Sequence, residues 1–195
     1  MSKREIVVAD LMPMADYAKV RTERRRALAA QKKLRRVEVG PHITFYFENY
    51  DTMWLQVQEM LHIEKGGAEQ IPDELAAYNP LIPQGDELVA TFMIEIDDPL
   101  RRKRILTGLG GIEETAFIRI GDLTVTAAPE ADTDRTSADG KASSVQFVHF
   151  RFTPAQIAAF CTPGAQVILG LSHPNYAHMA IIPEAVRHEL AGDFA

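Results

Sequence analysis

The chain has 195 residues, of which 46% are hydrophobic and 25% are charged, and its formal net charge is −6. This composition is typical of a globular protein and excludes collagen-like and intrinsically disordered chains. The single cysteine excludes an internal disulfide and a cysteine-rich zinc site, and it fits a reducing compartment. Because neither a run of roughly 18 apolar residues nor a secretory leader pattern is found, we expect a cytoplasmic protein without a membrane span.

Positive charge is concentrated near the start of the chain. Residues 1–36 contain 11 Lys or Arg and 4 Asp or Glu, whereas the remaining residues contain 10 and 23. Such a segment could neutralise phosphates and bind nucleic acid. It could equally be a solvated helix beside the acidic remainder of its own chain or of a second subunit. The isoelectric point of about 5.5 and the lack of a helix-turn-helix or zinc-finger pattern make nucleic acid the less favoured alternative. The basic residues concerned are Arg21, Arg24, Arg25, Arg26, Lys32, Lys33, Arg35 and Arg36.

The same segment is predicted to be mostly helical. After a short strand at residues 6–8, Asp16 can cap a long helix whose apolar residues form a thin stripe. We therefore expect residues 1–36 to form a basic helical segment and residues 37–195 to form a single α+β domain. A thin exposed apolar stripe often finds a partner, so the sequence also predicts a homodimer. The stripe consists of Tyr17, Val20, Leu28 and Leu34.

Two strands and a helix are expected next. Residues 37–39 form a short strand before a Gly-Pro turn, and residues 42–48 alternate between apolar and polar side chains, as in a half-buried strand. Asp51 is a suitable N-cap for a helix that reaches about Lys65, where two glycines end it. The polar face of the second strand presents His42, Thr44, Tyr46 and Glu48.

The rest of the chain is expected to alternate between strands and short helices. Residues 128–144 are small, polar or charged, which predicts a mobile loop that either acts as a lid or is a long polar excursion. Since no regular βαβ repeat is present, we predict an α+β fold with a mainly antiparallel sheet, helices packed on one face and the basic N-terminal helix as an extension. The expected strands span residues 88–96, 116–120, 123–127, 145–152 and 166–171, and the expected helices begin near Pro72, Asp98, Thr153 and Pro183.

Glu59 and His62 are the first candidate metal ligands, because Glu-x-x-His on a helix supplies ligands to di-iron centres in four-helix bundles. Such a centre needs a second copy of the motif, which the sequence lacks. The pair also falls on the polar side of its predicted helix. A solvated or partner-facing pair is therefore the alternative interpretation.

A second group of metal-ligating side chains is spread along the predicted strands. Histidines together with a carboxylate are the ligands of non-haem iron, zinc and manganese sites, and a twisted sheet could bring them together. Each residue could instead be a separate hydrogen-bonded or surface side chain, so a protein without any cofactor stays an open alternative. The group consists of His42, Glu48, Glu95, His149 and His173.

Residues 172–176 read as a turn at the end of a strand. Pro174 and Asn175 favour the turn for structural reasons, whereas His173 and Tyr176 could serve proton transfer or ligand binding. Cys161 lies on an amphipathic helix and is predicted to be a buried thiol, so nucleophilic catalysis finds little support.

Six motifs occur in order along the chain: Gly40-Pro-His42, Phe47-Glu-Asn49, Gln58-Glu-Met60, Tyr78-Asn-Pro-Leu-Ile-Pro83, the strand from Ala90 to Glu95, and His173-Pro-x-Tyr176. Together they resemble an uncharacterised proteobacterial family of unknown function. The resemblance covers about residues 5–192, and it carries over no activity, cofactor or catalytic residue. Genes of that family often lie beside those for rubrerythrin-like proteins and iron–sulfur oxidoreductases, which implies a redox or peroxide-stress context. The candidate site residues within these motifs are His42, Glu48, Asn49, Glu59, Asn79, Glu95, His173 and Tyr176.

Three functional hypotheses follow. The leading one is a cytosolic accessory or ligand-binding protein that acts with a rubrerythrin-like or iron–sulfur redox partner, through a polar pocket centred on His42, Glu48 and His173. The second is a metal-dependent enzyme that uses the same pocket, with histidine ligands and Glu95 or Glu59 as the base. The third is a nucleic-acid-binding regulator that uses the basic N-terminal helix.

Overall fold

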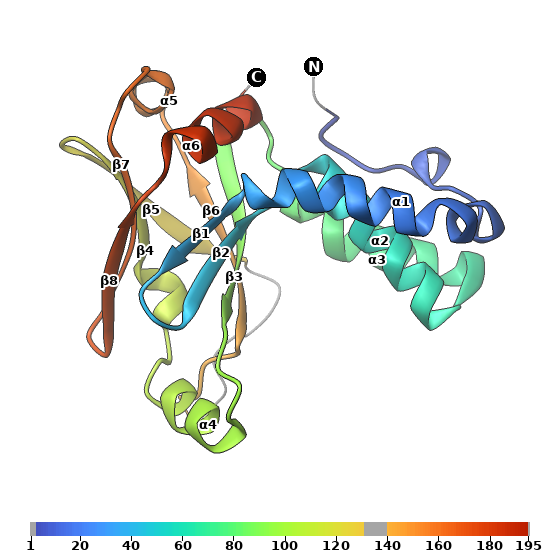
Figure 1. Cartoon of the computed structure of the whole chain (residues 1–195), viewed down its shortest axis with the longest axis horizontal. Coiled ribbons are helices and arrows are strands. Elements are labelled where there is room, and N and C mark those ends of the chain that lie inside the picture. Colours follow the sequence, from blue (N-terminus) through green and yellow to red (C-terminus); the bar gives the residue numbers. More distant parts are fainter. Residues whose placement is uncertain (1–2, 131–139, 195) are drawn as a thin grey trace.

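The computed structural model describes residues 3–130 and 140–194 of the chain. Its centre is an eight-stranded sheet in the order β1-β2-β3-β6-β5-β4-β7-β8, in which every neighbouring pair is antiparallel. The sheet curls until β1 and β8 approach each other, so it is nearly closed (Figure 1). The strands are β1 (Arg36–Val39), β2 (Ile43–Phe47), β3 (Glu87–Ile94), β4 (Ala116–Ile120), β5 (Leu123–Pro129), β6 (Val145–Arg151), β7 (Val167–His173) and β8 (Tyr176–Ile181).

The curled sheet encloses the main hydrophobic core. Side chains alternate along each strand, and those of one face of β2, β3 and β6 point into the interior. Phe45 and Phe92 lie opposite each other there with ring centroids 4.9 Å apart, and Phe150 packs beside them. The alternation expected for residues 42–48 is thus confirmed, as is the α+β fold with a mainly antiparallel sheet.

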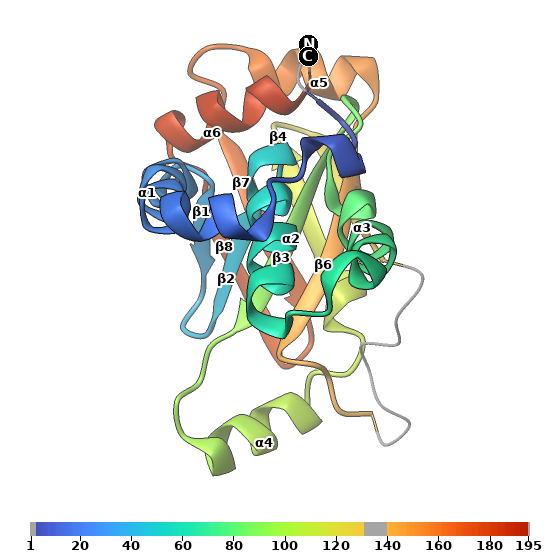
Figure 2. The ribbon, with the colours of Figure 1, turned by 90° about the vertical axis from the view of Figure 1, so that its right-hand side faces the viewer.

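Helices cover the outer face of β3 and β6. Val57 and Leu61 of α2 pack with Val89 of β3 and Phe147 of β6 in a second apolar cluster, and Figure 2 shows α2 and α3 in front of these strands. In the described part of the chain, no helix combines the length and the apolar character needed to cross a membrane. The helices are α1 (Met14–Lys33), α2 (Tyr50–Glu64), α3 (Ile71–Tyr78), α4 (Pro99–Thr107), α5 (Pro154–Cys161) and α6 (Glu184–Ala191). Short 3₁₀ helices occur at Val8–Asp10, Gly67–Gln70, Asn79–Leu81, Ile112–Thr115 and Gly192–Phe194.

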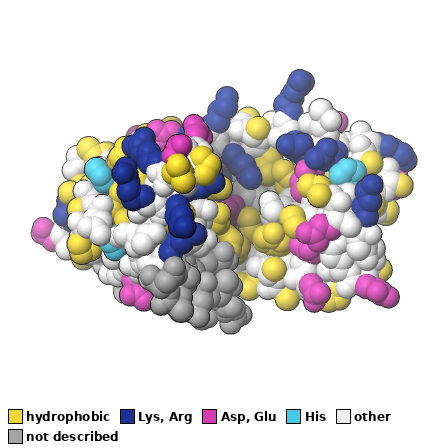
Figure 3. Space-filling model, turned by 90° about the horizontal axis from the view of Figure 1, so that it is seen from below, with side chains coloured by type: hydrophobic (Ala, Val, Ile, Leu, Met, Phe, Trp, Pro, Cys, Tyr) yellow, Lys and Arg dark blue, Asp and Glu magenta, His cyan; other side chains and the backbone are white. Residues whose placement is uncertain are grey.

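The remaining helices lie at the two ends of the sheet. Helix α4 lies at one end, while α5 and α6 lie at the other, close to both termini (Figure 1). Figure 3 views the molecule from the α4 end, where lysine and arginine side chains gather beside an apolar surface. Arg101, Lys103 and Arg104 of α4 are exposed there.

The basic helix α1 lies along α2. Tyr17 and Leu28 of the predicted stripe are buried, whereas Leu34 is 41% exposed. The ring of Tyr17 meets that of Trp54 of α2 edge to face at 6.2 Å, and Trp54 Nε1 donates to the main-chain oxygen of Asp10 at 2.9 Å. Tyr17 and Leu28 of the stripe therefore face their own chain, whereas Leu34 stays exposed.

Several expected element boundaries were wrong. Residues 6–8 form no strand, and a 3₁₀ helix begins at Val8. Helix α1 starts after Pro13, whose fixed φ suits a helix start, so Asp16 lies inside the first turn instead of capping it. The cap of α2 is Asn49, whose side chain accepts from the Thr52 amide at 3.0 Å, because Asp51 already lies within the helix.

Two further expectations near the C-terminus are corrected. The turn at residues 172–176 continues into β8, a strand we did not predict because its exposed, mixed side chains show no clean alternation. Cys161 is exposed at the end of α5, since it lies on the side of that helix away from the buried Phe160. Most of the loop expected over residues 128–144 lies outside the described residues, and Pro129 belongs to β5.

Candidate functional site

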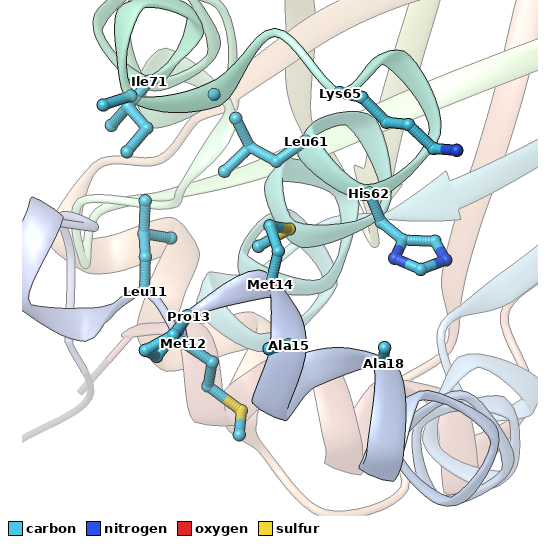
Figure 4. Close-up of a pocket in the computed structure, with 12 residues that line it drawn as sticks. Leu11, Met12, Pro13, Met14, Ala15, Ala18, Leu61, His62, Lys65 and Ile71 are labelled. Atoms are coloured by element: carbon cyan, nitrogen blue, oxygen red, sulfur yellow. The ribbon is translucent and has the colours of Figure 1, made fainter.

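A cavity of about 560 Å³ opens where the start of α1 meets the end of α2 and the start of α3. Figure 4 shows Leu61 and Met14 in its middle, with Leu11 and Ile71 on one side and His62 and Lys65 on the other. Its wall is almost entirely apolar and comes from three helices and the segment before α1. The lining residues are Leu11, Met12, Pro13, Met14, Ala15, Ala18, Leu61, His62, Lys65, Gly67, Ala68 and Ile71.

Local sequence explains the shape of this cavity. Pro13 is the N-cap of α1, and its fixed φ suits a helix start directly after Leu11 and Met12. Helix α2 ends at Lys65, which adopts the left-handed conformation with φ of 57°. Gly67, with φ of 69°, then turns the chain toward α3. These two turns leave a space between α1 and α3 that no large side chain fills.

Lys65 is unusual for its backbone. Among the described residues it is the only residue other than glycine with a positive φ. A side chain in this region costs roughly 1 kcal/mol relative to glycine, and helices usually place glycine at this position. Backbone strain of this kind is often retained at functional positions.

A network of polar side chains holds α1 to α2 next to the cavity. Arg21 donates from Nε and Nη2 to the two carboxylate oxygens of Glu59, each at 2.8 Å, and Tyr17 donates its hydroxyl to Glu59 at 2.5 Å. The hydrogen bond from Arg21 lowers the pKa of Glu59 to about 2. Burial and the bond to Glu59 raise the pKa of Tyr17. Glu59 thus stays ionised and fixes one wall of the cavity.

Glu59 and His62 do not act as a pair. Glu59 faces α1, which corrects the expectation that it lies on a solvated or partner-facing side, because Arg21 and Tyr17 of α1 occupy that position. The His62 ring instead meets the Tyr17 ring edge to face at 5.9 Å. The described residues contain no group of three or more His, Cys, Asp or Glu side chains placed to hold a metal ion.

The residues of the expected His42–Glu48–His173 pocket lie at different places. His42 and Glu48 bracket β2, so they are on the order of 20 Å apart along the strand. The Glu48 side chain, 7% exposed, accepts from the Thr91 hydroxyl at 2.7 Å. His173 accepts at Nδ1 from the Asn175 amide and lies 3.2 Å from the Gly110 oxygen at Nε2, which ties the β7–β8 turn to the chain after α4.

His42 and Tyr176, candidates from two different motifs, lie next to each other. The His42 amide donates to the Tyr176 hydroxyl at 2.9 Å, and the two rings lie 6.4 Å apart. His42 Nε2 also lies 3.5 Å from Nη2 of Arg101 in α4. Gly40 must be glycine here, because a side chain would collide with Tyr176 and His178. This cluster closes one end of the sheet.

Glu95 and His149 each have partners of their own. Glu95 accepts from Thr44 at 2.7 Å and from Tyr46 at 2.8 Å on the outer face of the sheet. His149 lies between two carboxylates, with Nδ1 3.0 Å from Glu87 and Nε2 2.8 Å from Glu130. Because the carboxylates contact opposite nitrogens, they pair with the ring and do not converge on a common ligand position.

The two asparagines among the candidates hold the main chain. Asn49 caps α2, and Asn79 bonds both main-chain groups of Ile6, accepting from its amide at 2.8 Å and donating to its oxygen at 3.0 Å. Asn79 therefore positions the segment before α1, which contributes to the apolar cavity, whereas Asn49 fixes the start of α2.

A second cavity, of about 490 Å³, is polar and lies between the starts of β1 and α2 and the end of α6. Asn49 lines it, and Arg35, only 2% exposed, lies against it. The Arg35 guanidinium donates to the main-chain oxygens of Phe47 and Glu48 at 3.0 Å and pairs with Asp193 at 2.5 Å. Burial raises the pKa of Asp193, although the positive charge of Arg35 and its hydrogen bond act in the opposite direction. Arg35 thus joins the sheet to the C-terminal segment.

The sequence analysis did not identify the apolar cavity. Its residues come from segments far apart in the chain, and most of them are ordinary apolar side chains. One signal was present: a lysine directly before two glycines at a helix end places a cation where the chain reverses direction.

The comparison with family models finds a match over nearly the whole chain. A family model described as "Protein of unknown function (DUF3501)" matches residues 5–194. The chain is also similar to a novel protein of unknown function from Burkholderia pseudomallei K96243, with 37% identity, coverage of 97% of this chain and 99% of that chain, and a TM-score of 0.90. The search of the curated proteins finds no match. The resemblance to a family of unknown function is confirmed, while its gene neighbourhood stays a prediction. The chain belongs to the DUF3501 family.

Proposed function

We propose that this protein binds a small apolar molecule in the cavity between α1, α2 and α3. The observation that carries the proposal is the cavity itself, about 560 Å³ in volume and lined almost entirely by apolar side chains. Ligand sites in proteins usually have volumes of about 300–1,000 Å³, apolar walls and a few polar groups. This cavity has all three properties.

The structure around the cavity supports a binding role. The Arg21–Glu59 ion pair and the Tyr17 hydroxyl hold α1 on α2, so the two main walls are fixed before any ligand arrives. Met12 and Met14 provide the opposite property, since unbranched thioether side chains adapt to ligands of different shape. A fixed frame with adaptable lining suits a binder of apolar molecules.

The test uses a neutral apolar fluorophore such as N-phenylnaphthylamine, whose emission rises in an apolar site. We expect saturable binding to the protein and a loss of affinity of about tenfold or more in Ala18→Phe, whose new ring enters the cavity. The matched control is Ala29→Phe, the same substitution on the exposed side of the same helix. Absence of saturable binding, or equal losses in both variants, contradicts the proposal.

The redox context remains a prediction that rests on the family resemblance. In this view the protein is an accessory of a rubrerythrin-like or iron–sulfur partner, and the cavity serves that system. The experiment is co-purification with the rubrerythrin-like protein encoded by the same organism, followed by gel filtration of the mixture. Co-elution at a defined ratio supports the role, and separate elution at micromolar concentration counts against it.

Within the described residues, no contact favours the other two hypotheses. The basic residues of the N-terminal segment are partly used within the chain, since Arg21 and Arg25 of α1 face Glu59, Arg24 lies over the Trp54 ring, and Arg35, which follows α1, is buried. A metal-dependent enzyme would need ligands that the described residues do not bring together. A salt-dependent DNA-binding assay and elemental analysis of untagged protein decide these two alternatives.

A further inference from the structure

The ionisable side chains that line the apolar cavity are all basic. Lys65 and His62 are its basic side chains, and none of the lining residues is an aspartate or glutamate. In Figure 4 both lie on the same side of the cavity, opposite Leu11 and Ile71. The site therefore has an apolar part and a cationic edge.

In the part of the chain that the structure describes, the Lys65 ammonium group has no carboxylate partner. The two carboxylates of the last turns of α2 have other partners: Glu59 accepts from Arg21 and Tyr17, and Glu64 accepts from Gln70. Although Gly66 and Gly67 follow directly, the left-handed position is held by a lysine. An unpaired cation in a strained position at a cavity edge is suited to a ligand's anionic group.

We propose that the ligand of this cavity is an amphipathic carboxylic acid, which deepens the proposed function and rests on it. The apolar chain lies against Leu11, Leu61 and Ile71, and the carboxylate lies at the cavity edge, where it pairs with Lys65. Because Lys65 is exposed, the carboxylate keeps part of its hydration while the chain leaves water. Burial of the ligand's apolar chain supplies most of the affinity, and Lys65 makes the site selective for a carboxylate head group.

A monoanionic carboxylate fits this edge better than a phosphate. Phosphate sites typically combine arginine side chains in bidentate contact with several main-chain amides. The lining contains no arginine, and one ammonium group is available beside the His62 ring. Lipid phosphates are therefore the contrasting ligand class in the test.

The experiment displaces the neutral fluorophore with straight-chain carboxylates, with alcohols of equal chain length and with alkyl phosphates. For the unaltered protein we expect carboxylates to bind about fivefold tighter than alcohols, the size of an exposed ion pair, and this preference to shrink at high salt. Each added methylene should tighten binding about fourfold until the chain fills the cavity.

Variants of Lys65 separate head-group recognition from chain binding. Lys65→Asn introduces a residue that also tolerates a positive φ, so the backbone should be unchanged. We expect this variant to bind carboxylates and alcohols with equal affinity, and its affinity for alcohols should match that of the unaltered protein. Lys65→Arg should retain the preference, and Lys33→Asn, a matched change at the end of α1 outside the cavity, should leave all affinities unchanged.

The outcomes distinguish the two proposals. If the fluorophore binds to the unaltered protein but carboxylates and alcohols displace it equally well, the carboxylate assignment is wrong. The proposal that the cavity binds apolar molecules is then still supported. Tighter binding of alkyl phosphates than of carboxylates also overturns the assignment. If the fluorophore does not bind at all, the proposed function itself falls.

Discussion

The Tyr176 hydroxyl donates to the main-chain oxygen of Val39 at 2.8 Å, across the seam between β8 and β1. The same hydroxyl accepts from the His42 amide at 2.9 Å, and the side chain is 5% exposed. Among the described residues, no main-chain hydrogen bond joins these two strands. A single buried side chain therefore supplies the polar contact that the sheet's main chain does not make.

This relationship predicts that Tyr176→Phe destabilises the fold. The change removes the hydroxyl partner of the part-buried His42 amide and of the buried Val39 carbonyl, which costs about 1–3 kcal/mol. Urea unfolding followed by circular dichroism measures the loss in free energy. Tyr46→Phe is the matched control, because its hydroxyl bonds Glu95 on the outer face and its removal should cost less. Equal losses in the two variants would contradict the role of the seam contact.

The ion pair between α1 and α2 predicts a loss of stability in acid. The hydrogen bond from Arg21 lowers the pKa of Glu59 to about 2, against an ordinary value of 4.5. A carboxyl whose folded pKa is depressed contributes stability that is present above 4.5 and is lost as the pH falls toward 2.

Glu59→Gln tests this prediction. At neutral pH we expect the variant to be less stable by about 1–2 kcal/mol, and its stability should fall less steeply below pH 4.5 than that of the unaltered protein. Glu23→Gln on the exposed side of α1 is the control. Parallel stability curves for Glu59→Gln and the unaltered protein would show that Glu59 makes no such contribution.

His149 predicts a loss of stability in alkali. Burial by itself would lower its pKa, but hydrogen bonds to Glu87 and Glu130 and their charges outweigh burial and raise it above 6.5. For Glu87, burial would raise the pKa, and the contact with His149 lowers it below 4.5. The cluster is therefore fully stabilising between these two ordinary values and weakens as the pH rises through the folded pKa of His149.

The measurement is the free energy of unfolding across this range. The unaltered protein should lose stability from about pH 6.5 upward, and His149→Gln should remove that part of the dependence. His188→Gln, an exposed histidine of α6, controls for an unspecific histidine effect. A pH dependence that survives in His149→Gln would place its origin elsewhere.

The two hydrogen bonds from Asn79 to the main chain of Ile6 hold the segment before α1 in place. Asn79→Ala removes both hydrogen bonds to Ile6, which is 1% exposed, so we expect faster hydrogen exchange over residues 3–13 and a stability loss of about 1–3 kcal/mol. Asn175→Ala is a matched change whose amide bonds Gly108 after α4. If exchange over residues 3–13 rises equally in both variants, Asn79 has no special role there.

Much of the architecture could be predicted from local patterns. The alternation of Ile43, Phe45 and Phe47 has the period of a half-buried strand, and Gly121-Asp122 makes the predicted hairpin between β4 and β5. The start of β8 was interpreted as a turn, because an exposed strand at the end of a sheet carries no alternation to reveal it.

For the candidate site, chemical character was visible in the sequence but proximity was not. The polar face of residues 42–48 was predicted correctly, yet His42 and Glu48 lie at opposite ends of one strand, where no twist of the sheet can join them. His42 and Tyr176 do meet, because the sheet curls far enough to bring β8 to β1. That closure depends on all eight strands and is not encoded in any short segment.

The sequence by itself determined the class of fold, the polar and apolar faces of its strands and membership of a family, because these follow from periodicity and local motifs. The tertiary structure decided that Glu59 faces Arg21, that part of the stripe of α1 is covered by α2, and that an apolar cavity with Lys65 at its edge exists. A cavity is the space left between helices from separate parts of the chain. Its volume and charge are set by how those helices pack, and no local pattern of residues specifies that packing.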